Sequence, residues 1–185
     1  MLGKCFKMLK KVICISISTI FFMFIDENVY ANSKIKPPTF EEKFAEVGYK
    51  TVEEAEKEFE TFCKCEVELP TTIPSISFTH KFGRFFQDTE YNMNNNLEIM
   101  YVNEDVRENI FKIEIRPLKN KQNFEGNEYK LLDGEKGIYF EHQIFNFFVF
   151  ENNGLQYLIG IHKQKELAKS KTPDFLVDIA NSIIK

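Results

Sequence analysis

The feature that most constrains the fold is an alternating pattern of large apolar residues near the end of the chain. The alternation begins directly after Asn153 and Gly154, and its apolar members are Leu155, Tyr157, Ile159 and Ile161. A period of two places every second side chain on one face of a β-strand. An Asn-Gly pair is the strongest short-range signal for a two-residue turn between strands. The sequence therefore predicts a β-hairpin over residues 144–161.

The same period recurs through the middle of the chain. Further strands are predicted over residues 97–102 and 111–116 and on both sides of a turn at residues 133–134. Pro70 and Pro74 interrupt an earlier apolar run. After them, Ile76, Phe78 and Phe82 fit one face of a first strand. Most of the chain between residues 66 and 162 is thus expected to be β-structure.

Helices are predicted at both ends of this β-region. Thr39 and Thr51 each stand three residues before a glutamate, the pattern of a capping box in which side chains and backbone amides satisfy one another. Two short amphipathic helices are therefore expected first. Near the end, Thr172 suits an N-cap and Pro173 the first helical position. The apolar stripe of this last helix is Leu176, Ile179, Ala180 and Ile183.

This order of elements predicts an α+β fold. We expect a single antiparallel sheet, a curved meander, with N-terminal helices and a C-terminal helix packed on one face. Residues 1–31 are expected to be a signal peptide, residues 32–38 a flexible lead-in with two prolines, and residues 39–185 a single α+β domain.

The N-terminus has the three-part pattern of a secretory signal peptide. Residues 4–11 contain four lysines and no acid, residues 12–25 carry no charge, and Val29-Tyr30-Ala31 offers tolerated residues before a cleavage point. The alternative is a retained membrane anchor. As a helix the uncharged run would cover only ~21 Å, short of a ~30 Å hydrocarbon core. We therefore expect cleavage near Ala31, a secreted or extracytoplasmic protein, and no stable transmembrane span in the mature form.

Charge argues against one class of partner. The whole chain carries 24 basic and 28 acidic residues. Residues 1–31 hold four lysines and two acids, so the mature chain has 20 basic and 26 acidic residues and a net charge of −6. Such a chain does not bind nucleic acid through bulk electrostatics, because phosphate binding requires basic side chains.

Familiar catalytic motifs are missing from the sequence. His80, His142 and His162 are scattered over predicted strands and lack the spacing of a zinc-binding helix. There is no nucleophile elbow, phosphate-binding glycine loop or dinucleotide fingerprint. The expectation is a protein that is not an enzyme, with no catalytic residues, no metal ligands and no cofactor.

Cys63 and Cys65 are the cysteines that remain after cleavage. On a helix their side chains point to nearly opposite faces, and on a strand their Cβ atoms stand too far apart, so a bridge requires an irregular turn. Closing so short a loop removes little chain entropy. We expect unpaired or passively oxidised thiols, with a redox pair or a metal site as the alternative.

The strand before Asn153 is unusually rich in phenylalanine. Phe145, Phe147, Phe148 and Phe150 occupy both of its faces. The hairpin register places Phe148 and Phe150 on one face and Phe147 with Val149 on the other. The simpler interpretation is a central strand covered on both sides. The functional interpretation is that one face of these phenylalanines forms an apolar ligand or partner surface.

The order of several motifs resembles a known family. These motifs are a Glu-Ala-Glu-Lys helix, Val67-x-Leu69-Pro70, Ile73-Pro74, the strand from Leu97 to Tyr101, the run from Gly154 to Gly160, and the closing segment from Phe175 to Ile183. Together, over residues 51–184, they resemble the extracytoplasmic domain of unknown function 4367 of Gram-positive envelope proteins. The resemblance implies an antiparallel sheet with flanking helices, an extracytoplasmic location and no established catalytic residues.

Two functions are compatible with these observations. The first is an exported interaction or sensing module of the cell envelope, without catalytic activity, whose partner is an unidentified envelope protein. The alternative is a carrier that holds an acyl chain or another apolar ligand on a curved, Phe-lined sheet. A closed core favours the module, whereas an open cavity of roughly several hundred Å³ lined by phenylalanine favours the carrier.

Overall fold

Three α-helices, one short 3₁₀ helix and seven strands make up the regular structure of the described residues. The computed structural model describes residues 36–91, 94–163 and 172–184. Its elements, all within the compact unit Pro38–Lys185, are α2 (Phe40–Glu46), α3 (Val52–Cys63), β1 (His80–Phe86), β2 (Asn96–Val102), β3 (Ile110–Pro117), the short 3₁₀ helix η1 (Leu118–Asn120), β4 (Asn127–Lys130), β5 (Lys136–His142), β6 (Phe145–Asn152), β7 (Leu155–His162) and α4 (Thr172–Asn181).

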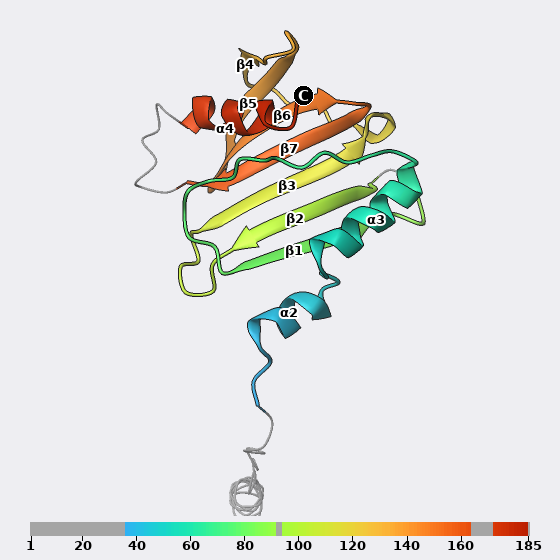
Figure 1. Ribbon diagram of the computed structural model, residues 1–185, viewed down its shortest axis with the longest axis vertical. Helices are drawn as coiled ribbons and strands as arrows, with labels where there is room; N and C mark the ends of the chain where they lie inside the picture. Colours follow the sequence, from blue (N-terminus) through green and yellow to red (C-terminus); the bar gives the residue numbers. More distant parts are fainter. Residues whose placement is uncertain (1–35, 92–93, 164–171, 185) are drawn as a thin grey trace, which may run out of the picture. The chain divides into compact units, whose positions relative to one another are not determined.

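The strands form one open antiparallel sheet in the order β1-β2-β3-β7-β6-β5-β4. Two consecutive meanders, β1–β3 and β4–β7, join where β3 pairs with β7. The predicted α+β fold, with a single antiparallel meander, two N-terminal helices and a C-terminal helix, is confirmed (Figure 1). The hairpin turn is also confirmed, because Asn153 and Gly154 both have the positive φ angles that such a turn requires.

One face of the sheet, called here the inner face, carries α3 and α4 (Figure 1). Helix α3 packs on β1 and β2, and α4 packs on β6. The predicted apolar stripe of the last helix is fully buried there, from Leu176 through Ile179 and Ala180 to Ile183. These residues share one core with the inward-facing residues of β2, β3 and β7, so both helices are held by the burial of one continuous apolar surface.

A long irregular segment, residues 64–79, crosses the inner face between the two helices (Figure 1). Its apolar side chains, among them Ile76 and Phe78, pack on the same core. The prediction that Ile76, Phe78 and Phe82 share one strand face is wrong. The backbone bends repeatedly before β1 begins at His80, so the period of two does not carry through. Phe82 consequently points to the opposite, outer face.

Helix α2 packs against this outer face at the β1 edge. The Phe44 and Phe82 rings stack with centroids 4.2 Å apart, and Phe40 and Tyr49 complete the cluster. Both predicted capping boxes are present, with Thr39 and Thr51 as the N-caps. Local capping sets where each helix begins, and the apolar contacts decide which face of the sheet it covers.

None of the helices in the described residues is long and apolar enough to cross a membrane. The predicted signal peptide, residues 1–31, lies outside the described residues.

Candidate functional site

The four phenylalanines of β6 divide between the two faces of the sheet in the predicted register. Phe148 and Phe150 point inward, where they are almost completely buried in the core below α4. Phe145 and Phe147 point outward. Only this outward pair therefore belongs to a surface that a ligand or a partner could reach.

On the outer face, the outward pair belongs to a longer series of stacked rings. Consecutive ring centroids lie 5.0 Å apart between Phe124 and Phe140, 5.2 Å between Phe140 and Phe147, and 5.6 Å between Phe147 and Phe145. The planes of neighbouring rings are tilted by 18° to 24°. We call Phe124, Phe140, Phe147 and Phe145 the aromatic row. It joins the loop before β4 to strands β5 and β6.

A glycine on the neighbouring strand makes room for the row. Gly160 of β7 stands opposite Phe147, and a Cβ atom on Gly160 would lie only 2.6 Å from the Phe147 ring. Real Cβ atoms do not approach other atoms so closely, so alanine here would displace the ring. The missing side chain lets the Phe147 ring lie flat over β7.

Lys112 of β3 reaches over the same glycine. Its Nζ atom lies 5.3 Å from the Phe145 ring centroid and 5.1 Å from that of Phe147, within the range of a cation–π interaction. The Lys112 ammonium also pairs with Glu114 at 3.0 Å, and Glu114 accepts a hydrogen bond from the Arg116 guanidinium at 3.1 Å. The row thus has a charged border in which one carboxylate is shared by two cationic side chains.

On the other half of the outer face, charged and polar groups lie beside the aromatic contacts of α2. Arg84 of β1 pairs with Glu98 of β2 at 2.7 Å. The Tyr49 hydroxyl donates a hydrogen bond of 2.7 Å to the same carboxylate. Burial, followed by this hydrogen bond, raises the pKa of Tyr49 well above its usual value. These contacts favour a role in attaching the α2 region to the sheet.

The aromatic row is partly open to solvent. Phe147 is 8% exposed and Val149 5%, whereas Phe124, Phe140 and Phe145 are only half-buried. The three helices of the described part of the chain lie elsewhere: α3 and α4 on the inner face, and α2 at the β1 edge. An aromatic surface that is held rigidly and left half-exposed is typical of the centre of a protein interface.

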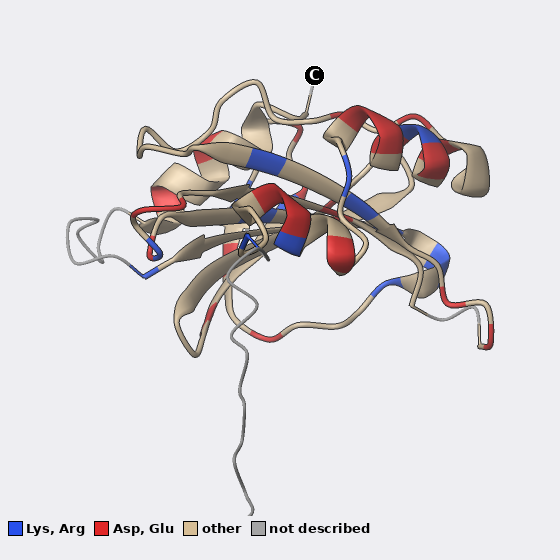
Figure 2. Ribbon diagram, turned by 90° about the horizontal axis from the view of Figure 1, so that it is seen from below, with Lys and Arg blue, Asp and Glu red and all other residues tan. Residues whose placement is uncertain are grey.

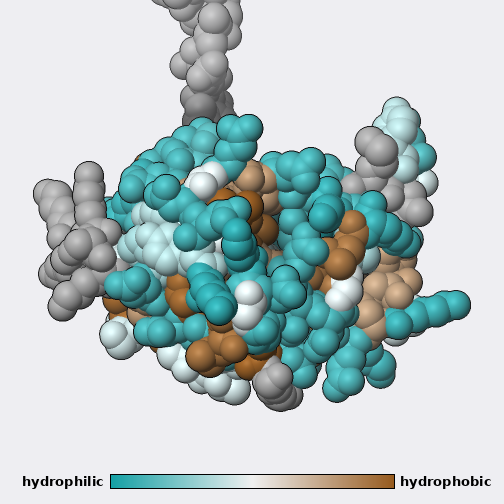
Figure 3. All heavy atoms as spheres, turned by 90° about the horizontal axis from the view of Figure 1, so that it is seen from above, coloured by the Kyte–Doolittle hydropathy of each residue, from teal (hydrophilic) through white to brown (hydrophobic). Residues whose placement is uncertain are grey.

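The hollow beside the row has a volume of about 550 Å³, and the phenylalanines in its lining are Phe124 and Phe150. Ile138 and Val149 also line it, and the other lining residues are Gly154 and polar or charged residues of the 121–124 loop, of strands β5, β6 and β7 and of the turns that join them. In a view from above, apolar side chains reach the surface in separate patches between polar ones (Figure 3). The row is therefore a strip of partly buried rings beside a hollow whose lining is mostly polar.

The cysteine pair is oxidised. Cys63, the last residue of α3, forms a disulfide bond with Cys65, and the Cα atoms are 5.2 Å apart. Lys64 between them has a left-handed backbone with φ 56°, which is the irregular turn that the geometry demands. Of the two expected states, unpaired or oxidised, the structure contains the oxidised one, and a redox role for the pair stays a prediction.

The three histidines lie apart from any catalytic set. His80 contacts Glu41 of α2 at 2.9 Å and the Thr79 hydroxyl at 2.7 Å. His142 and His162 stand on either side of Phe145 in the β5-β6-β7 register. Within the described residues, no group of three or more His, Cys, Asp or Glu side chains is placed to hold a metal ion.

Sequence reasoning found Phe145 and Phe147 but missed Phe124 and Phe140. The one signal for the row was Gly160, which interrupts an otherwise apolar strand and so marks a close approach of another group. Phe124 could not have been found, because it comes from a loop with no periodic pattern.

No family model, curated protein or solved structure matches this chain. The resemblance to the extracytoplasmic domain of unknown function 4367 remains a prediction.

Proposed function

We propose that the protein is a non-catalytic interaction or sensing module of the cell envelope, exported from a Gram-positive cell, which binds a protein partner through the aromatic row. The observation that carries this proposal is the half-buried, stacked row on the outer face of the sheet. Aromatic residues are enriched at the centres of protein interfaces, where they contribute most of the binding free energy. The signal-peptide pattern supports export, and the family resemblance supports an envelope location.

The shape of the surface favours a protein over an acyl chain. A carrier gains about 0.8 kcal/mol for each methylene group that it buries completely, and this requires a cavity that surrounds the ligand. On the aromatic row, whose rings are partly open to solvent, an acyl chain would stay in contact with water on one side. A protein partner has its own apolar surface and can cover the row from above.

Site-specific photo-cross-linking in the source cell tests this proposal. A photoreactive phenylalanine analogue replaces Phe145 in one strain and Leu132 in another. Leu132 is the control position, because it is 79% exposed and lies in the β4–β5 turn, away from the row. We expect a discrete cross-linked protein from position 145 and none from position 132. Phe140→Ser should abolish the product, whereas Leu132→Ser should leave it unchanged.

Two results would contradict the proposal. One is equal cross-linking from both positions, which would indicate non-specific contact. The other is saturable binding of a fluorescent fatty acid to the delipidated domain at low micromolar concentration, lost in Phe145→Ser. That outcome would establish the carrier instead.

A further inference from the structure

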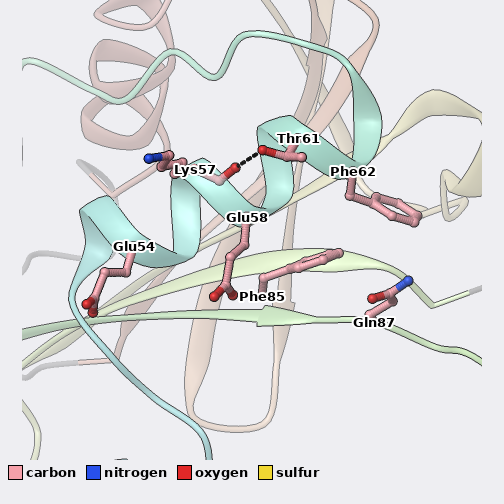
Figure 4. A pocket seen from close by; sticks show the side chains of 7 residues that line it. All are labelled: Glu54, Lys57, Glu58, Thr61, Phe62, Phe85 and Gln87. Atoms are coloured by element: carbon pink, nitrogen blue, oxygen red, sulfur yellow. Dashed lines mark hydrogen bonds between the residues drawn. The ribbon is translucent and has the colours of Figure 1, made fainter.

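A second hollow lies on the other side of the molecule, between α3 and the end of β1 (Figure 4). Its volume is about 550 Å³, and it is lined by Glu54, Lys57, Glu58, Thr61, Phe62, Phe85 and Gln87. It shares no residue with the aromatic row. What distinguishes it is that one of its walls is the edge of a β-sheet.

The edge of β1 is paired at one position only. The Gly83 amide and carbonyl bond to Lys50 at 2.9 and 2.8 Å, which shows that they point away from β2. In an antiparallel pair the direction of these groups alternates from residue to residue, so those of Phe85 also point to the free edge. Within the described residues, no second segment pairs with β1 at Phe85. Unpaired edges of this kind accept additional strands.

The Lys50 bridge shows how this edge accommodates an extended chain. Besides its two backbone bonds to Gly83, Lys50 reaches up to α3, where its ammonium pairs with Glu58 at 2.8 Å. One residue thus combines strand pairing with β1 and an ion pair with the helix above. A segment placed further along the edge, beside Phe85, would likewise contact both the backbone of β1 and the acidic side chains of α3.

Beyond Lys50 the hollow has an aromatic wall. The Phe62 and Phe85 ring centroids are 5.2 Å apart, and Phe85 also contacts the fully buried Phe59 at 5.7 Å. Phe62 and Phe85 are themselves only half-buried. They offer an apolar side chain a place beside the strand edge.

The helix above the edge is strongly acidic. Helix α3 contains five glutamates and one lysine, and acidic residues dominate its surface (Figure 2). Glu54, Glu58 and Lys57 of α3 all line the hollow (Figure 4), and Glu58 also pairs with Lys50. The charge at this edge therefore complements a cationic segment.

From these contacts we propose that the β1 edge and α3 form a binding site for an extended, cationic peptide segment of a partner protein. The segment adds to the sheet as a strand at Phe85, in the manner of β-augmentation. A basic side chain pairs with Glu54 or Glu58, and an apolar side chain packs beside Phe62. This site is separate from the aromatic row, so either proposal can fail without the other.

Three synthetic peptides test the site by fluorescence anisotropy with the purified domain. The first is a labelled eight-residue peptide of lysine and valine. The second has glutamate in place of lysine, and the third has the first sequence with alternate backbone nitrogens methylated, which prevents strand pairing. We expect saturable binding of the first peptide alone. Hydrogen exchange of the Phe85 amide should slow when that peptide is present.

Protein variants locate the binding. Glu58→Lys should weaken binding by at least about tenfold, because it repels the cationic peptide. Glu104→Lys is the matched control: it reverses an exposed charge in the β2–β3 turn, and we expect a change within about twofold. Phe145→Ser, in the aromatic row, should also have no effect. Thr61→Trp fills the hollow from an exposed position and should abolish binding in a domain with an unchanged circular dichroism spectrum.

The site is refuted if the glutamate or the methylated peptide binds as tightly as the first. Equal weakening by Glu58→Lys and Glu104→Lys would likewise refute it, because the attraction would then be bulk charge. So would protection from hydrogen exchange that appears on other strands and not on β1.

Discussion

Replacing Ile179 by alanine measures how far the fold depends on α4. The Ile179 side chain is fully buried between α4 and the inner face of the sheet. The substitution removes roughly three methylene equivalents, which at ~0.8 kcal/mol each correspond to about 2.4 kcal/mol of lost burial. The strands beneath are fixed by their ladders and cannot close the cavity completely, so we expect a total loss of about 3–4 kcal/mol.

Urea unfolding followed by circular dichroism gives this loss as a shift in the free energy of unfolding. Asp178→Ala is the matched control, because Asp178 is the exposed neighbour on the same helix. The control should change stability by less than about 0.5 kcal/mol. A similarly small effect of Ile179→Ala would show that α4 does not pack on the sheet, and the description of the inner face would then be wrong.

Four further results are expected. Gly160→Ala should cost about 1–3 kcal/mol of stability, because its methyl group displaces the Phe147 ring; an unchanged urea midpoint would contradict this. Reduction of the Cys63–Cys65 bridge should shift the melting temperature by less than about 2 °C, since so short a loop restricts the unfolded chain little, and a large drop would show that the bridge is structural. Burial raises the pKa of Tyr157 to about 12. The stability that the protonated Tyr157 contributes is therefore complete below its unfolded pKa of about 10 and is lost as the pH rises through 12. Tyr157→Phe should flatten the dependence of the unfolding free energy on alkaline pH, and an identical pH dependence in the variant would disprove the raised pKa. Mass spectrometry of the native protein should find an N-terminus at or near Asn32, and peptides from residues 1–11 in mature material would show that the leader is retained.

Local chemistry explains why the elements were predictable. The capping boxes at Thr39 and Thr51 and the turn at Asn153-Gly154 depend on residues that are neighbours in the chain, so their signals are complete within a few positions. The alternation of β7 likewise placed Tyr157 and Ile159 on the buried face. The same periodicity correctly divided the phenylalanines of β6 between the two faces of the sheet.

Long-range contacts decided what could not be predicted. The period of two placed Phe82 on the same strand face as Ile76 and Phe78, but bends ahead of β1 and the aromatic contact with Phe44 of α2 place it on the outer face. The union of the two meanders through β3 and β7 brings Lys112 over Phe147, although the residues are far apart in sequence. Phe124 joins the same row from a loop.

The sequence by itself determined the α+β class, the starts of α2 and α3, the hairpin and the buried stripe of α4, because each rests on propensity and periodicity within one segment. Only the tertiary structure decided which aromatic rings stack on the outer face and that the β1 edge lies open beside an acidic helix. Both surfaces arise where segments that are distant in the chain pack together. The free energy of this packing depends on how closely their side chains fit, which no single stretch of sequence encodes.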